Sequence, residues 1–112
     1  MPHILIADDE PRLAAFLEKG LVASGYATTT AYDGPTALQL ARDDTFDLVL
    51  LDVGLPGIDG LGVLRELRRR GERLPVIIIT AGDEIEGHGA DDLLTKPFSF
   101  AKLLTHVRQQ LE

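Results

Sequence analysis

Five polar side chains that could do chemistry together stand just behind short apolar runs of this sequence. They are Asp8, Asp9, Asp52, Thr80 and Lys96. Clustered carboxylates repel one another and need a cation, and oxygen-only ligands suit a hard ion such as Mg²⁺. A hydroxyl and an ammonium group opposite that ion would bind the oxygens of a phosphoryl group. These residue types therefore indicate a phosphoryl site in which Asp52 is the nucleophile and forms an acyl phosphate.

Each of these residues also has an ordinary structural explanation. An acid behind a strand is often the N-cap of the next helix, as Asp9 could be. Asp52 could form a turn, Thr80 could simply end its strand, and Lys96 could be a solvated surface charge. The combination argues against these explanations, because two acids, a hydroxyl and an ammonium group are unlikely to follow four strands by chance.

The apolar runs themselves have the pattern of parallel β-strands, because they are unbroken rather than alternating. The expected strands cover residues 4–7, 27–31, 48–51, 76–79 and 93–94. The run 27–31 is β-branched but less apolar than the others, and the run 93–94 is the weakest. Parallel strands end at one edge of a sheet, and such sheets bind their ligands at that edge. We therefore expect the five polar side chains to converge there.

Helical patterns alternate with these runs. The expected helices begin near Pro11, Asp33, Gly60 and Ser99, with apolar residues three or four positions apart on one face. The basic run 68–70 precedes a glycine and is interpreted as a solvated helix end rather than a nucleic-acid patch. Alternating strands and helices predict an α/β fold with a doubly wound, five-stranded parallel sheet.

Composition limits the functions that remain. The chain has 112 residues and no cysteine, so we expect one domain over residues 1–112 without a disulfide or a thiolate metal site. Its formal charge of −7 argues against binding of nucleic acid or of an anionic membrane by this segment. No apolar run approaches the ~18 residues of a membrane span. No basic stretch precedes the first run, and the expected location is the cytoplasm.

These motifs together resemble the receiver domain of two-component response regulators over nearly the whole chain. The matching stretches are 4–10, 47–60, 75–81 and 89–98. Residues 96–100 are most similar to the subfamily that carries a winged-helix DNA-binding output domain. The resemblance implies the strand order 2-1-3-4-5. It also implies a signalling protein whose only chemistry is its own phosphotransfer and dephosphorylation.

The same resemblance implies a role for each site residue. Asp52 accepts a phosphoryl group from a sensor histidine kinase, while Thr80 and Lys96 contact that group. The implied Mg²⁺ ligands are Asp8, Asp9, Asp52 and the carbonyl of Gly54. The bond between Lys96 and Pro97 is expected to be cis, which is rare in proteins. Phosphorylation would shift a two-state equilibrium and switch an output, namely transcription regulation through a DNA-binding domain outside this chain.

Two features depart from the pattern of the family. Leu93 stands where an aromatic residue is usual, so the aromatic arm of the switch is missing. Only residues 81–91 connect the last two strands, whereas a crossover that contains a helix needs at least ~10–12 residues. Three glycines in this span weaken a helix further. We therefore expect the fourth helix of the family to be truncated or missing.

The shortened connection leads to two further expectations. It should uncover apolar surface near Ile77, Ile79 and Leu94, and an uncovered apolar patch tends to find a partner. Any homodimer is therefore expected to form independently of phosphorylation. The departures also leave open a degenerate receiver, which would act as an interaction module without phosphate.

Two other classes of protein fit less well. Phosphatases of the haloacid dehalogenase type place their nucleophile in an Asp-x-Asp motif after the first strand, where this chain has Asp8, Asp9 and Glu10. A flavin-binding module of the same topology would need a loop that cradles phosphate at that point, and the sequence has none there.

Overall fold

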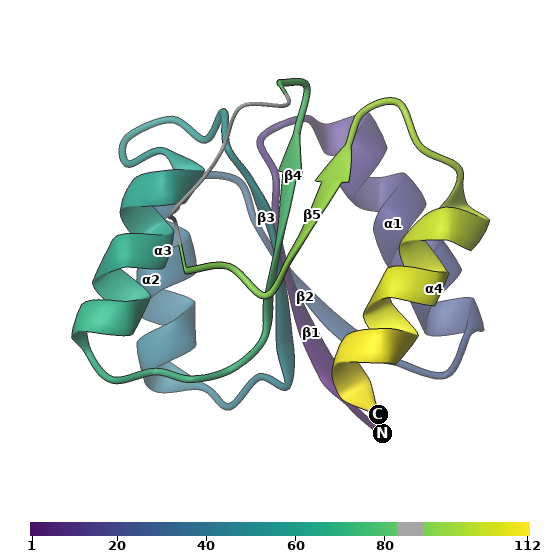
Figure 1. Ribbon diagram of the computed structural model, residues 1–112, viewed down its shortest axis with the longest axis horizontal. Coiled ribbons are helices and arrows are strands. Elements are labelled where there is room, and N and C mark those ends of the chain that lie inside the picture. The colour runs from purple at the N-terminus through teal and green to yellow at the C-terminus, as the bar shows by residue number, and fades with distance from the viewer. Residues whose placement is uncertain (83–88) are drawn as a thin grey trace.

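The computed structural model describes residues 1–82 and 89–112, which form a parallel sheet between two layers of helices (Figure 1). The strands are β1 (His3–Ala7), β2 (Ala27–Ala31), β3 (Leu48–Asp52), β4 (Val76–Thr80) and β5 (Asp92–Thr95). Their order across the sheet is β2-β1-β3-β4-β5, and every neighbouring pair is parallel. The predicted doubly wound α/β fold is confirmed, and so is the strand order.

The helices of the described residues are α1 (Pro11–Ala23), α2 (Gly34–Asp43), α3 (Gly60–Arg69) and α4 (Phe100–Leu111). Helices α1 and α4 cover one face of the sheet, and α2 and α3 cover the other (Figure 1). Asp33, Asp59 and Ser99 cap α2, α3 and α4, because each side chain accepts a backbone hydrogen bond from the first turn. The N-cap predicted at Ser99 is confirmed. No helix within the described ranges is long and apolar enough to cross a membrane.

The strands are covered on both faces, as the unbroken apolar runs predict. Strands β3 and β4 are buried along their whole length. Alternate residues of a strand point to opposite faces of the sheet. Core residues of the sheet under α2 and α3 therefore include Leu5, Val49, Leu51 and Ile78. Those under α1 and α4 include Ile4, Ile6, Leu50, Ile77 and Leu94. Burial of each such side chain contributes about 1.5–3 kcal/mol, which stabilises the sheet between its two helix layers.

The prediction of an uncovered apolar patch near Ile77, Ile79 and Leu94 is wrong. All three side chains are at most 1% exposed, and they lie in the core on the side of α1 and α4. The physical reason is the direction of the side chains, because the α2–α3 side of β4 and β5 is lined instead by residues such as Ile78 and Leu93. Without this patch, the prediction of a phosphate-independent homodimer loses its basis.

The predicted truncation of the fourth helix falls mainly on residues 83–88, which lie outside the described residues. The described parts of this connection, 81–82 and 89–91, contain no helix. The basic run 68–70 closes α3, as predicted. Arg69 and Arg70 both pair with Glu66, and Arg68 donates to carbonyls of the following loop. These local contacts agree with the interpretation of the run as a helix end.

Candidate metal and phosphoryl site

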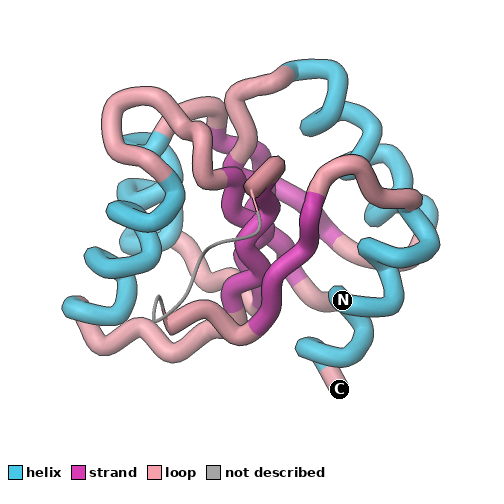
Figure 2. The backbone as a smooth tube through the Cα atoms, turned by 45° about the horizontal axis from the view of Figure 1, so that its top comes forward, coloured by secondary structure: helices cyan, strands magenta, loops and turns pink. Residues whose placement is uncertain are grey.

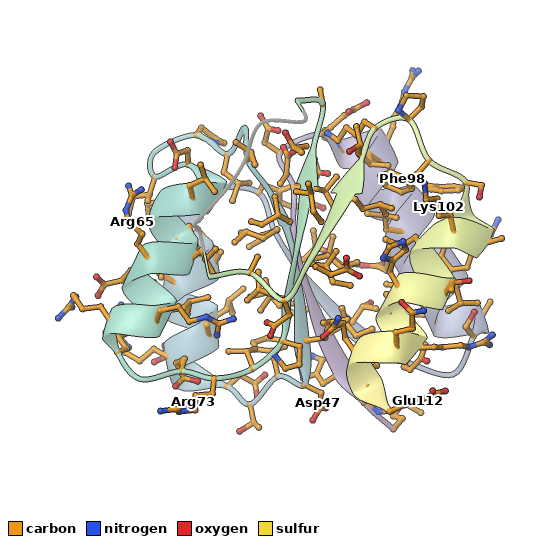
Figure 3. The ribbon with its side chains drawn as sticks, viewed as in Figure 1. Asp47, Arg65, Arg73, Phe98, Lys102 and Glu112 are labelled. Atoms are coloured by element: carbon orange, nitrogen blue, oxygen red, sulfur yellow. The ribbon has the colours of Figure 1, made fainter. Side chains whose placement is uncertain are left out.

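The polar residues that we expect to act together lie at one edge of the sheet. The parallel strands end at the upper edge in Figure 1, and Figure 2 turns this edge toward the viewer. Asp8 follows β1, Asp52 ends β3, Thr80 ends β4 and Lys96 follows β5. Asp47, which precedes β3, lies at the opposite edge and is separate from this cluster (Figure 3).

Three carboxylates form a compact cluster at this edge. Carboxylate oxygens of Asp8, Asp9 and Asp52 all lie within 4.8 Å of one another. Asp8 and Asp52 are buried and Asp9 is exposed, so the cluster meets solvent on the side of Asp9. The N-cap of α1 is Glu10, whose side chain makes no capping hydrogen bond. Asp9 is therefore not the cap of this helix, and its ordinary structural explanation does not apply.

Asp8 is buried without full compensation of its carboxylate. Its Oδ1 accepts a hydrogen bond from the backbone N–H of Glu10 at 2.9 Å. Its Oδ2 is buried, and within the described part of the chain it has no hydrogen-bond partner. Burial raises the pKa of Asp8 above its ordinary value, the charges of Asp52 and Asp9 add to this, and the Glu10 N–H and Lys96 oppose it. A divalent cation held by these oxygens would compensate the buried charge, so the residues fit Mg²⁺.

Lys96 faces the carboxylate of Asp52. The distance between Lys96 Nζ and Asp52 Oδ1 is 3.3 Å, and the lysine side chain is 28% exposed. Lys96 is therefore a partner of Asp52 rather than a solvated surface charge. Its backbone N–H donates to the carbonyl of Thr80 at 2.8 Å, which ties the end of β5 to the end of β4. The bond between Lys96 and Pro97 is cis, as predicted.

Thr80 is buried at the end of β4, and its hydroxyl oxygen accepts one hydrogen bond. The backbone N–H of Gly82 donates to Thr80 Oγ1 at 3.0 Å. Because the oxygen accepts this bond, the hydroxyl hydrogen remains for another acceptor. Gly54 lies beside the carboxylate cluster, since a Cβ added there would be 3.5 Å from Asp52 Oδ2. The edge thus brings together three carboxylates and an ammonium group, with the Thr80 hydroxyl at the end of the neighbouring strand β4.

Two glycines that the sequence patterns did not single out also support this site. Gly34 and Gly60 each begin a helix; Gly34 lies against the backbone of the loop that follows β3, and Gly60 against the backbone at the end of β3. A Cβ added to Gly34 would lie 2.0 Å from the carbonyl oxygen of Ile58, and one added to Gly60 would lie 2.3 Å from that of Asp52. The sequence did carry a signal, because an Asp-Gly pair opens both helices. An aspartate that caps a helix and is followed by glycine is compatible with another stretch of backbone packing directly against the first turn of that helix.

Comparison with known proteins identifies the family. Residues 4–108 match the family described as the response regulator receiver domain. The chain is 43% identical over 115 residues to the uncharacterized transcriptional regulatory protein YkoG of Bacillus subtilis, with 97% of this chain and 50% of that protein covered. It is 41% identical over 115 residues to the transcriptional regulatory protein TctD of Salmonella typhimurium, with 97% and 51% covered. The chain spans about half the length of the curated relatives it matches.

Solved structures agree with this family. The receiver domain of the Francisella response regulator 1452 is similar with a TM-score of 0.94 at 36% identity, covering 99% of this chain and 97% of that one. TrrA of Thermotoga maritima, in complex with Mg²⁺-BeF, gives a TM-score of 0.92 at 35% identity, with 99% and 100% covered. The chain therefore belongs to the family of response regulator receiver domains.

Proposed function

We propose that Asp52 is the residue of this receiver that accepts a phosphoryl group, in a reaction that requires Mg²⁺. One arrangement supports the proposal: Asp52 is a buried carboxylate that shares a cluster with Asp8 and Asp9, and the ammonium group of Lys96 lies 3.3 Å from its Oδ1. A carboxylate that is fixed by its neighbours and flanked by cationic charge is suited to attack an anionic phosphoryl group.

Each of the other site residues has a role in the proposed transfer. The ion would be held by Asp8, Asp9, Asp52 and the carbonyl of Gly54. When bound, it supplies positive charge to the oxygens of the phosphoryl group. Lys96 supplies a second positive charge from the protein itself. Thr80 donates its free hydroxyl hydrogen to a phosphoryl oxygen, while the N–H of Gly82 holds the hydroxyl oxygen in place.

The proposed chemistry is a displacement at phosphorus. A carboxylate oxygen of Asp52 attacks the phosphorus of a phosphohistidine, so that an O–P bond forms while the P–N bond of the donor breaks. The electron pair of the broken bond stays on the histidine nitrogen. Hydrolysis of the acyl phosphate by water later restores the carboxylate and releases inorganic phosphate. The domain acts only on itself, and we propose no further enzymatic activity.

The proposed partner that donates the phosphoryl group is a sensor histidine kinase. The proposed output is transcription regulation by a DNA-binding domain outside this chain. The relatives support this output, because YkoG and TctD are both called transcriptional regulatory proteins and are about twice as long as the part matched here. The formal charge of −7 favours a domain that does not itself contact nucleic acid. We place residues 1–112 in the cytoplasm as one receiver domain.

A degenerate receiver that binds partners without phosphate is the second candidate, and Leu93 favours it. This leucine pairs in register with Ile78 of β4 and is partly buried against the core under α2 and α3. A leucine has no hydroxyl group and a smaller body than the aromatic residue expected here. The five site residues favour the first candidate, because a degenerate receiver has no need of all of them.

Phosphorylation by a small donor tests the proposed function. The protein is incubated with acetyl phosphate and Mg²⁺, and its intact mass is measured. The parent chain should gain one phosphoryl group, and Asp52→Asn should gain none. Asp59→Asn is the matched control, because it changes a nearby exposed acid and asparagine still caps α3. An adduct of parental amount in Asp52→Asn would overturn the assignment, and a parent chain without any adduct would favour the degenerate receiver.

A further inference from the structure

Gly60, the first residue of α3, lies directly against the backbone of the proposed phosphoacceptor. A Cβ at this position would be 2.3 Å from the carbonyl oxygen of Asp52 and 2.8 Å from the Cα of Val53. Real Cβ atoms do not approach other atoms so closely. Both contacts are with backbone, so rotation of a neighbouring side chain cannot relieve them. The close approach of α3 to β3 therefore depends on the absence of a side chain at Gly60.

The backbone of Gly60 also holds the residue after Asp52. Its N–H donates to the carbonyl of Val53 at 3.0 Å, and the N–H of Val53 donates to the carbonyl of Ile79 in β4 at 3.1 Å. Both polar groups of the Val53 backbone are thus engaged, one by α3 and one by the neighbouring strand. Their positions set the direction in which the chain leaves Asp52 and enters Gly54.

The far end of the same loop is fixed in a similar way by α2. The backbone N–H of Gly34 donates to the carbonyl of Pro56 at 3.1 Å. A Cβ on Gly34 would lie 2.0 Å from the carbonyl oxygen of Ile58. Gly57, between these two contacts, has a φ of 81°, a left-handed conformation that favours glycine. The loop 53–59 is therefore held between the first residues of two helices.

From this geometry we infer that Gly60 is a positioning residue for Asp52 and for the carbonyl of Gly54. It acts by letting α3 close onto the Asp52–Val53 peptide, which orients the carboxylate and the loop that would complete the metal site. This inference rests on the proposed function, because it assigns a purpose to the position of Asp52. A methyl group at Gly60 would push the peptide away from α3. It would displace the carboxylate of Asp52 without changing the chemical identity of any side chain in the cluster.

The test compares Gly60→Ala with Gly62→Ala. Both changes add one methyl group to α3 and raise its helix propensity alike. At Gly62 the new Cβ would lie 2.8 Å from Cγ2 of Ile58, 3.4 Å from Oδ1 of Asp59 and 3.8 Å from a guanidinium nitrogen of Arg65. All three are side-chain atoms, and the nearest belongs to Ile58, which is exposed and can rotate. Three quantities are measured: the rate of phosphorylation by acetyl phosphate at saturating Mg²⁺, the thermal unfolding, and the ¹H–¹⁵N shifts of Val53 and Gly54 without metal.

We expect Gly60→Ala to remain folded at the assay temperature but to be phosphorylated about tenfold or more slowly, as for a misplaced reacting group. The amide shifts of Val53 and Gly54 should move in Gly60→Ala and stay in place in Gly62→Ala. A Gly60→Ala chain with the parental rate and unmoved shifts would overturn the inference. If the parent chain itself takes no phosphoryl group, the proposed function fails, and the amide shifts still decide the role of Gly60.

Hydrogen exchange of the parent chain keeps the inference testable if Gly60→Ala does not fold. The amide of Gly60 should exchange as slowly as the buried amides of β3, because its bond to Val53 would break only when α3 leaves the sheet. Exchange of this amide at the rate of an open loop would overturn the inference.

Discussion

The Nδ1 atom of His106 in α4 lies 2.5 Å from Oδ2 of Asp92, the first residue of β5. Both side chains are only 23% exposed, so the contact lies partly inside the boundary between the helix and the edge strand. Asp92 also accepts a hydrogen bond from the N–H of Leu93 through its Oδ1. One carboxylate thus connects the start of β5 to the middle of α4.

Removal of either partner should weaken the fold measurably. We expect His106→Ala and Asp92→Ala each to lower the free energy of unfolding by about 1–3 kcal/mol, because a partly buried polar group loses its partner. The double variant should lose less than the sum, with a coupling energy on the order of 1 kcal/mol in urea denaturation. Lys102→Ala is the control on an exposed position of the same helix (Figure 3) and should change stability by less than about 0.5 kcal/mol. Additive effects of the two single changes would contradict the contact.

Asp8→Asn should stabilise the metal-free protein at neutral pH. Burial raises the pKa of Asp8, so the folded chain holds this proton more tightly than the unfolded chain does. Ionisation of Asp8 therefore costs stability. The cost is absent below the ordinary pKa of an aspartate and develops as the pH rises through the raised pKa of the folded state. The gain from Asp8→Asn should grow from acidic to neutral pH in the presence of a chelator, as measured by urea denaturation. A gain of equal size at every pH would count against an uncompensated charge at Asp8.

Mg²⁺ should raise the melting temperature of the parent chain. A ligand that binds only the folded state stabilises it by about 2.7 kcal/mol at a concentration 100 times its Kd. Asp9→Asn should lose most of this shift, and the double variant Asp9→Asn/Asp52→Asn should lose all of it. Glu72→Gln removes one exposed negative charge away from the cluster and should keep the parental shift. An unaltered shift in the double variant would refute the proposed ligands.

The acyl phosphate should be short-lived, because Gly82, two residues after Thr80, has no side chain that would keep water away from the site. A Cβ at Gly82 would lie 3.7 Å from Thr80 Oγ1, which is an ordinary van der Waals contact, so the backbone there accepts a side chain beside the Thr80 hydroxyl. We expect Gly82→Arg to slow dephosphorylation several-fold by covering the site. Gln109→Arg adds the same side chain to an exposed position of α4 and should decay like the parent. Equal decay rates of Gly82→Arg and the parent, followed by mass spectrometry, would show that access of water is not limited at this position.

The strands, and the placement of the polar residues at one edge of the sheet, could be predicted because each depends on local pattern. An unbroken run such as 76–79 indicates a buried strand, and a parallel sheet then brings its following residue, Thr80, to the same edge as Asp52. The cis bond at Lys96 and the cap at Ser99 likewise follow from short motifs. For these features, neighbours in the sequence contain the necessary information.

Other features depend on distances between segments that the sequence does not specify. The side of the sheet to which Ile77 and Leu94 point follows from the pairing register and from where α4 returns, and this is why the predicted apolar patch is wrong. The contact of Gly60 with the Asp52 carbonyl depends on how closely α3 approaches β3. The unpartnered Oδ2 of Asp8 depends on which backbone amides lie within reach. Neither the periodicity of the sequence nor a short motif specifies these distances and directions.

The acyl phosphate should form on Asp52 and not on another carboxylate of the cluster. Borohydride reduces an acyl phosphate of aspartate to the alcohol, which converts the labelled residue into homoserine. The chain is treated with acetyl phosphate and Mg²⁺, reduced, digested and sequenced by mass spectrometry. We predict homoserine in place of Asp52 alone. Homoserine in place of Asp8 or Asp9, with Asp52 unchanged, would contradict the assignment of Asp52 as the phosphoacceptor.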